Sequence, residues 1–122
     1  MTHPNINVAL YKFLTYAKEC FCKGINPNMD IVRDALDMDP AYFNNIVRMA
    51  SDEGLVTGVE WSEWQDYKDQ VITPSQWAIT LKGVEYLENN SLMAKARHAV
   101  GTTFASALAA AIEATVSKGL GL

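Results

Sequence analysis

Three amphipathic helical segments followed by two short strands predict a mostly helical α+β domain, a winged helix-turn-helix. The chain of 122 residues is long enough to bury one core without disulfides or metal ions. The clearest signal is PAYFNNIVRMASDEGLVTGVEW, residues 40–61, where an apolar-periodic helix runs into Glu53-Gly54 and continues as an alternating strand. This order is typical of the third helix of such a domain, at the point where it passes into the wing.

The first helix is predicted from apolar residues that recur at three- and four-residue steps. The row consists of Ile6, Leu10, Phe13, Leu14, Ala17 and Phe21. Asn5 or Asn7 can cap the start of the helix, and Gly24 can adopt the left-handed conformation that ends one. We therefore expect one face of this helix to lie in the core.

Two more helices should follow after a short turn. Asn28 can cap the second helix, whose inward residues would be Ile31, Val32, Ala35 and Leu36. Asp39 followed by Pro40 is a strong start signal for the third helix, because Asp is a good N-cap and proline suits the first helical position. The third helix should bury Phe43, Ile46, Val47 and Ala50.

The wing is predicted from a strand, a polar hairpin tip and a returning strand. Residues 55–61 alternate and are rich in strand-forming residues, and SEWQDYKDQ, residues 62–70, forms the tip. Either VIT, residues 71–73, or WAIT, residues 77–80, can return the chain, and Pro74 disfavours continuous pairing through both. Thr80 can then cap a short helix that contains Val84, Tyr86 and Leu87.

The segments DEGLVTGVEW and ITLKGVEYLENN resemble the pattern of the YjcQ-like winged-helix family of small bacterial and prophage-associated proteins. The matching residues are Glu53, Gly54 and Leu55 at the helix-to-wing junction and Ile79, Thr80, Gly83 and Leu87 at the strand-to-helix exit. The resemblance covers roughly residues 5–90. It implies a winged-helix domain without a catalytic motif, and a function assumed from the fold by analogy.

Residues 91–122 follow the domain of residues 1–90 and predict one long helix. Its apolar row at four-residue steps is Leu92, Ala96, Val100, Phe104, Leu108, Ile112 and Val116. Lys95, Arg97 and Glu113 argue against a membrane span. The helix can pack on its own domain or on a second subunit, and its high apolar content favours a partner. The residues expected to form a homodimer are Val100, Gly101, Phe104, Ala105, Leu108 and Ile112. Gly101 and Ala105, with Ala109, make a row of small residues that would let a second helix approach closely.

No pattern of catalytic, metal-binding or cofactor-binding residues stands out. His3 and His98 have no nucleophile or carboxylate at a telling spacing, and Cys20-x-Cys22 lacks a second ligand pair. The acids at 60, 63, 66 and 69 lack the glycine and the terminal Glu of a calcium loop. We expect no enzyme activity, no cofactor and no small-molecule substrate. Free thiols without an export signal suggest the cytoplasm.

The charge distribution decides between DNA and protein as the expected partner. The net charge is −4, and residues 24–90 hold four basic against twelve acidic residues, a net −8. Such a surface repels a phosphate backbone. The exposed third-helix residues suited to reading bases are Tyr42, Asn44, Asn45, Arg48 and Ser51, and the expected wing contacts are Trp64, Tyr67 and Lys68. A protein-binding module is favoured, and a DNA-binding regulator that reads the major groove is the alternative.

Overall fold

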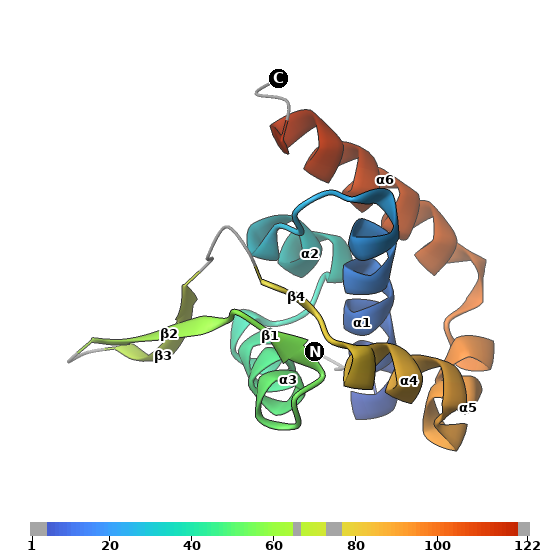
Figure 1. Ribbon diagram of the computed structural model, residues 1–122, viewed down its shortest axis with the longest axis horizontal. Helices are drawn as coiled ribbons and strands as arrows, with labels where there is room; N and C mark the ends of the chain where they lie inside the picture. The colour runs from blue at the N-terminus through green and yellow to red at the C-terminus, as the bar shows by residue number, and fades with distance from the viewer. Residues whose placement is uncertain (1–4, 65–66, 73–76, 120–122) are drawn as a thin grey trace.

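The computed structural model describes residues 5–64, 67–72 and 77–119, and for residues 61–64 and 67–72 it describes the backbone alone. The helices are α1 (Ile6–Lys23), α2 (Met29–Leu36), α3 (Pro40–Asp52), α4 (Leu81–Asn89), α5 (Ser91–Ala99) and α6 (Gly101–Gly119). The strands are β1 (Val56–Thr57), β2 (Glu60–Trp64), β3 (Tyr67–Ile72) and β4 (Ala78–Ile79) (Figure 1). The fold is therefore mostly helical α+β, as the sequence predicts.

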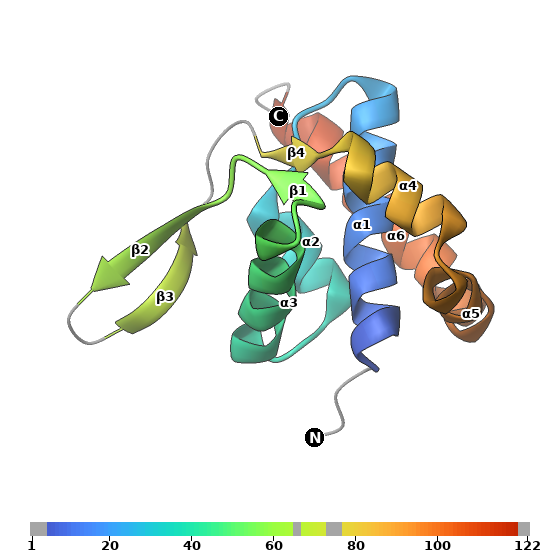
Figure 2. The same cartoon turned by 60° about the horizontal axis from the view of Figure 1, so that its bottom comes forward.

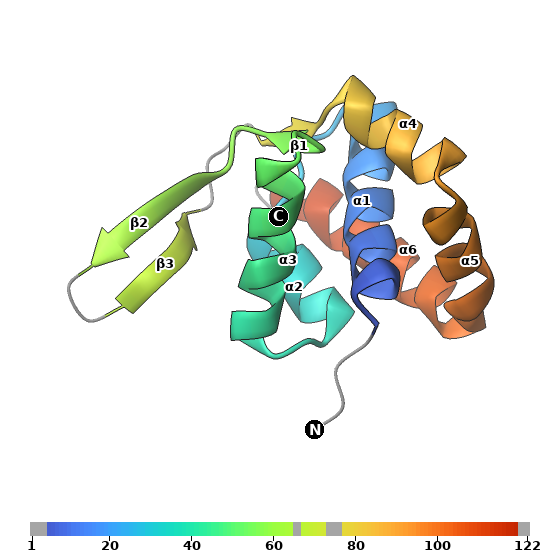
Figure 3. The ribbon, with the colours of Figure 1, turned by 90° about the horizontal axis from the view of Figure 1, so that it is seen from below.

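Helix α1 occupies the centre of the molecule. Helices α2 and α3 lie on one side of it and α4 and α5 on the other, while α6 packs against both α1 and α2 (Figures 1 and 3). The Trp77 ring stacks on Phe13, with centroids 5.3 Å apart and planes at 3°, and Phe13 meets Phe43 edge-on at 6.0 Å. These three buried rings join the residue before β4 to α1 and α3.

The expected helix caps are confirmed. The side chains of Asn5, Asn28, Asp39 and Thr80 each accept a hydrogen bond from a backbone N–H in the first turn of their helix, and Gly24 ends α1 at φ 69°. The inward residues of α3 are the four predicted ones. The α1 row is wrong at its two ends, because Ile6 is 50% and Phe21 is 65% exposed. Ile6 is the first residue of α1 and Phe21 lies in its last turn, and a helix end has packing neighbours on fewer sides.

The predicted single strand over residues 55–61 is in fact two strands. Gly58, at φ 82°, lies between β1 and β2. Strand β1 pairs antiparallel with β4, and β2 pairs antiparallel with β3, so each of the two candidate returning segments contributes to a different pair. The β2–β3 hairpin projects away from the helices (Figure 2). Gly83 is buried where α4 meets the chain at Leu55, and a Cβ there would collide with the Leu55 carbonyl.

The predicted continuous helix after Ser91 is also wrong. The chain forms α5 and α6, which are bent by 95° at Gly101, where φ is 69°. The bend folds α6 back on its own domain, so Phe104 and Ile112 are buried within one chain. Among the described helices none is by itself both long and apolar enough to cross a membrane, and α5 and α6 meet those criteria only as a bent pair.

Phe43→Ala tests the position of α3 in this core. Phe43 is 1% exposed, and truncating a buried Phe costs about 3–5 kcal/mol because a cavity remains. Met49, on the same helix, is 36% exposed, so Met49→Ala is the matched control and should cost less than about 1 kcal/mol. Urea unfolding of the two variants measures both values. Equal stabilities of the two variants would show that the inward face of α3 is misplaced.

Candidate interaction surface

The outward face of α3 is defined by its buried row. Phe43, Ile46, Val47 and Ala50 point into the core. Ala41, Asn45, Arg48 and Asp52 recur at three- and four-residue steps on the opposite side of the helix. Asn45 and Asp52 are exposed, and Arg48 is half-buried. The centre of this face therefore carries one cation, one carboxylate and one amide.

The other predicted recognition residues flank this centre. Asn44 and Ser51 are half-buried on one flank, and Tyr42 is half-buried on the other. Tyr42 and Arg48 each interact with another residue of the chain. Asp52 was missed by the sequence analysis, although its place four residues after Arg48 puts it on the same face.

The β2–β3 hairpin lies beside α3, and β3 is close to that helix (Figure 3). Trp64 ends β2 and is the register partner of Tyr67, which begins β3, with Lys68 next along that strand. The structure thus places the backbones of the three predicted wing residues together at one end of the hairpin. Their side chains lie outside the described part of the structure. Helix α3 and the hairpin form what we call the α3–hairpin surface, residues 40–52 with 60–64 and 67–72.

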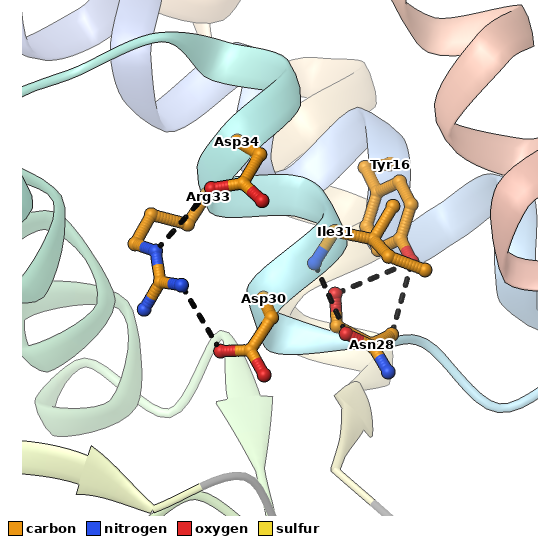
Figure 4. A network of polar contacts seen from close by, with 6 residues as sticks. All are labelled: Tyr16, Asn28, Asp30, Ile31, Arg33 and Asp34. Carbon is orange, nitrogen blue, oxygen red and sulfur yellow. Dashed lines mark hydrogen bonds and ion pairs between the residues drawn. The ribbon is translucent and has the colours of Figure 1, made fainter.

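Two acidic side chains flank Arg33 on α2. The Arg33 guanidinium lies 3.2 Å from an Asp30 carboxylate oxygen and 3.7 Å from one of Asp34 (Figure 4). Asp30 and Asp34 remain 53% and 80% exposed at their side chains. The positive charge of Arg33 is therefore balanced locally, and α2 adds exposed negative charge to the half of the molecule that holds α3.

A chain of hydrogen bonds fixes the start of α2. The Asn28 N–H donates to the Tyr16 hydroxyl at 2.9 Å (Figure 4), and the Thr115 hydroxyl donates to the Ala111 carbonyl at 2.7 Å. The Tyr16 hydroxyl also lies 2.6 Å from the Thr115 hydroxyl, where either oxygen can be the donor, and 3.5 Å from the Asn28 carbonyl oxygen. The Asn28 side chain also caps α2 at the Ile31 N–H. One tyrosine thus ties α1, the cap of α2, and α6 together.

Burial changes the acidity of Tyr16, a member of these hydrogen bonds, and of Cys20, one helical turn further along α1. It raises the pKa of Tyr16 from 10.0 to about 12 and the pKa of Cys20 from 9.0 to about 11. Both groups are therefore neutral at physiological pH, and a neutral thiol is a poor nucleophile. Cys22, two residues along α1, is exposed, and neither cysteine forms a disulfide. The expected buried structural thiol is Cys20.

Two hollows of about 420 Å³ each lie on the surface of the described part of the chain. The first lies between the α1–α2 turn and β4, with Phe21, Ile25 and Trp77 in its walls. The second lies between α1, α4 and α5, where Lys18 and Glu88 form an ion pair at 3.8 Å. Within the described residues no group of three His, Cys, Asp or Glu side chains is placed to hold a metal ion.

The fold defines a mostly helical α+β protein with a projecting antiparallel hairpin. A family model described as YjcQ protein matches residues 11–102, and the chain belongs to the YjcQ family. The match covers the region from α1 to the first residues of α6. No curated protein and no solved structure matches the chain significantly.

Tyr16→Phe tests the hydrogen-bond chain. The Asn28 N–H loses its acceptor, so the variant should be less stable by about 1–3 kcal/mol near pH 7. Tyr86→Phe, at a half-buried tyrosine of α4, is the control and should change stability by less than about 0.5 kcal/mol.

The same comparison should depend on pH. The folded protein holds the Tyr16 proton more tightly than the unfolded chain, so this contribution to stability is complete below pH 10 and is lost as pH rises towards 12. The stability difference between wild type and Tyr16→Phe should therefore shrink from pH 10 to pH 12. A difference that stays constant over this range would show that folding does not raise the pKa of Tyr16.

Proposed function

We propose that this protein is a non-catalytic winged-helix interaction module, of phage or prophage type, that binds a protein partner through the α3–hairpin surface. In this proposal α1, α2 and α3 are the three helices of the domain, and the β2–β3 hairpin is its wing. The observation that carries the preference for protein is the net charge of −8 over residues 24–90, which contain the whole α3–hairpin surface.

The local charges support the same preference. Binding to duplex DNA depends on Lys and Arg side chains that neutralise phosphates and release counterions. Arg33 already faces two carboxylates, and Arg48 shares the outward face of α3 with Asp52. An incoming phosphate would approach more acids than cations on this half of the molecule.

The proposed partner carries a basic surface, because complementary charge steers association and disfavours wrong partners. Asn45 and the 36% exposed Met49 offer polar and apolar contacts on α3. Trp64 and Tyr67 on the hairpin are residue types enriched at protein interfaces. The free thiols of Cys20 and Cys22 are compatible with the cytoplasm as the proposed compartment.

A DNA-binding regulator is the second candidate function. It is favoured by one observation, the presence of Asn45 and Arg48 on the outward face of α3 with Asn44 beside them. Asn can pair with adenine and Arg with guanine in the major groove. In this alternative α3 is the recognition helix.

A salt-titrated assay with random duplex DNA tests the preference. We expect no appreciable binding at physiological salt, because the α3–hairpin surface lies in the acidic segment. Micromolar or tighter affinity with a steep negative salt slope would favour the DNA-binding alternative. In that case Arg48→Ala should weaken specific binding by about 1–3 kcal/mol, the range for a bidentate base contact. Arg97→Ala on α5, outside the α3–hairpin surface, is the matched control and should have a smaller effect.

A further inference from the structure

A single residue separates α5 from α6. Val100 still has helical backbone angles, φ −76° and ψ −22°, and its N–H donates to the Ala96 carbonyl at 3.2 Å. Gly101, at φ 69°, is the residue at which the chain leaves this helical path. A Cβ built on Gly101 would meet no atom within 4 Å. A side chain at position 101 would therefore meet no steric obstacle, and only the positive φ of the bend disfavours one.

The sequence on both sides of Gly101 is compatible with one continuous helix. The apolar row at four-residue steps passes through the bend without a change of phase, from Leu92 to Val116. If Gly101 adopted helical angles, residues 91–119 would form one helix roughly 43 Å long. In that form α6 would point away from its own domain.

The main contacts of α6 are with α1 and α2, which any copy of the chain presents. Phe104 lies 6.1 Å from Tyr11, ring centroid to ring centroid, and the Lys12 ammonium lies 5.8 Å from the Phe104 ring. Thr115 bonds to Tyr16, and Ile112 is buried. Helices α1 and α2 of a second copy would offer the same partners to the same residues of α6.

We propose that two copies of this chain form a dimer by exchanging α6. In this dimer α5 and α6 straighten at Gly101, and each α6 occupies the α1–α2 face of the other copy. The complementarity of that face to α6 is shown by the contacts within one chain, and exchange of an identical element preserves those contacts. The proposal is independent of what binds the α3–hairpin surface.

Exchange also explains how the residues expected in a dimer can reach a second subunit. Phe104 and Ile112 are each 8% exposed in the single chain, so they cannot contact a partner while α6 remains docked. Ala105 and Ala109 lie on the exposed side of α6. A dimer through that exposed side would leave Phe104 and Ile112 in place, whereas exchange transfers them to the partner.

Gly101→Ala in the full chain tests the proposal. Alanine disfavours the left-handed backbone of the bend and favours a helix. The straight helix of the exchanged dimer is therefore favoured over the bend of the monomer at two positions in each dimer. The dimer dissociation constant should fall at least about tenfold. Sedimentation velocity over a range of protein concentrations measures it, and circular dichroism reports folding.

Two matched variants separate the hinge effect from general strain. Gly101→Asn should leave the dissociation constant close to that of wild type, because asparagine tolerates left-handed angles. Gly24→Ala introduces alanine at the same φ of 69° and also meets no atom within 4 Å, but Pro27 prevents α1 from continuing. This variant should lose stability without gaining dimer.

Ala109→Glu distinguishes exchange from a dimer through the exposed side of α6. Combined with Gly101→Ala, it should leave an exchanged dimer intact. The proposal is overturned if Gly101→Ala leaves the dissociation constant unchanged, or if Ala109→Glu returns the Gly101→Ala protein to a monomer. A Gly101→Ala chain that does not fold overturns it as well, because the exchanged dimer would hold alanine at position 101 within a continuous helix.

Discussion

The stack of Trp77 on Phe13 is the contact on which the arrangement of sheet and helices depends. Trp77 is fully buried immediately before β4, so it holds the returning chain against α1 while β4 pairs with β1. A large aromatic side chain contributes more by burial than any other residue type. The indole N–H has no hydrogen-bond partner among the described residues, a cost of about 1–3 kcal/mol that the buried ring must exceed. The hairpin is contacted from another side, because β3 lies against α3.

Much of the fold could be predicted from the sequence because its signals are local. The side chains of Asn28, Asp39 and Thr80 cap helices within three residues of themselves, and the inward row of α3 follows from helical periodicity. The breaks at Gly58 and Gly101 could not be predicted in this way. An apolar pattern continues through each break, and both glycines are compatible with regular structure. Their positive φ values are selected by distant packing, the pairing of β1 with β4 and the docking of α6.

The candidate site could likewise be predicted only where its signals are local. Asn45 and Arg48 were found because a helix has only one face opposite its buried row, and Asp52 follows from the same geometry once the row is known. The bond between Tyr16 and Thr115 links residues 99 positions apart, and nothing in the neighbourhood of either residue indicates it. Side-chain partners across such a separation are fixed by tertiary packing alone. The role of Tyr16 therefore depends on the folding of α6 back on α1 and α2, which no local pattern predicts.

That separation of 99 residues has a consequence during synthesis. At rates of about 5–20 residues per second, Tyr16 is made roughly 5–20 s before Thr115. Helix–coil transitions and short-loop closure take microseconds or less, so α1 and α2 have time to form before the helix that covers them exists. The face that α6 covers is therefore exposed for seconds before the other half of this contact is made, and during that time a completed copy of the chain could bind it through its own α6.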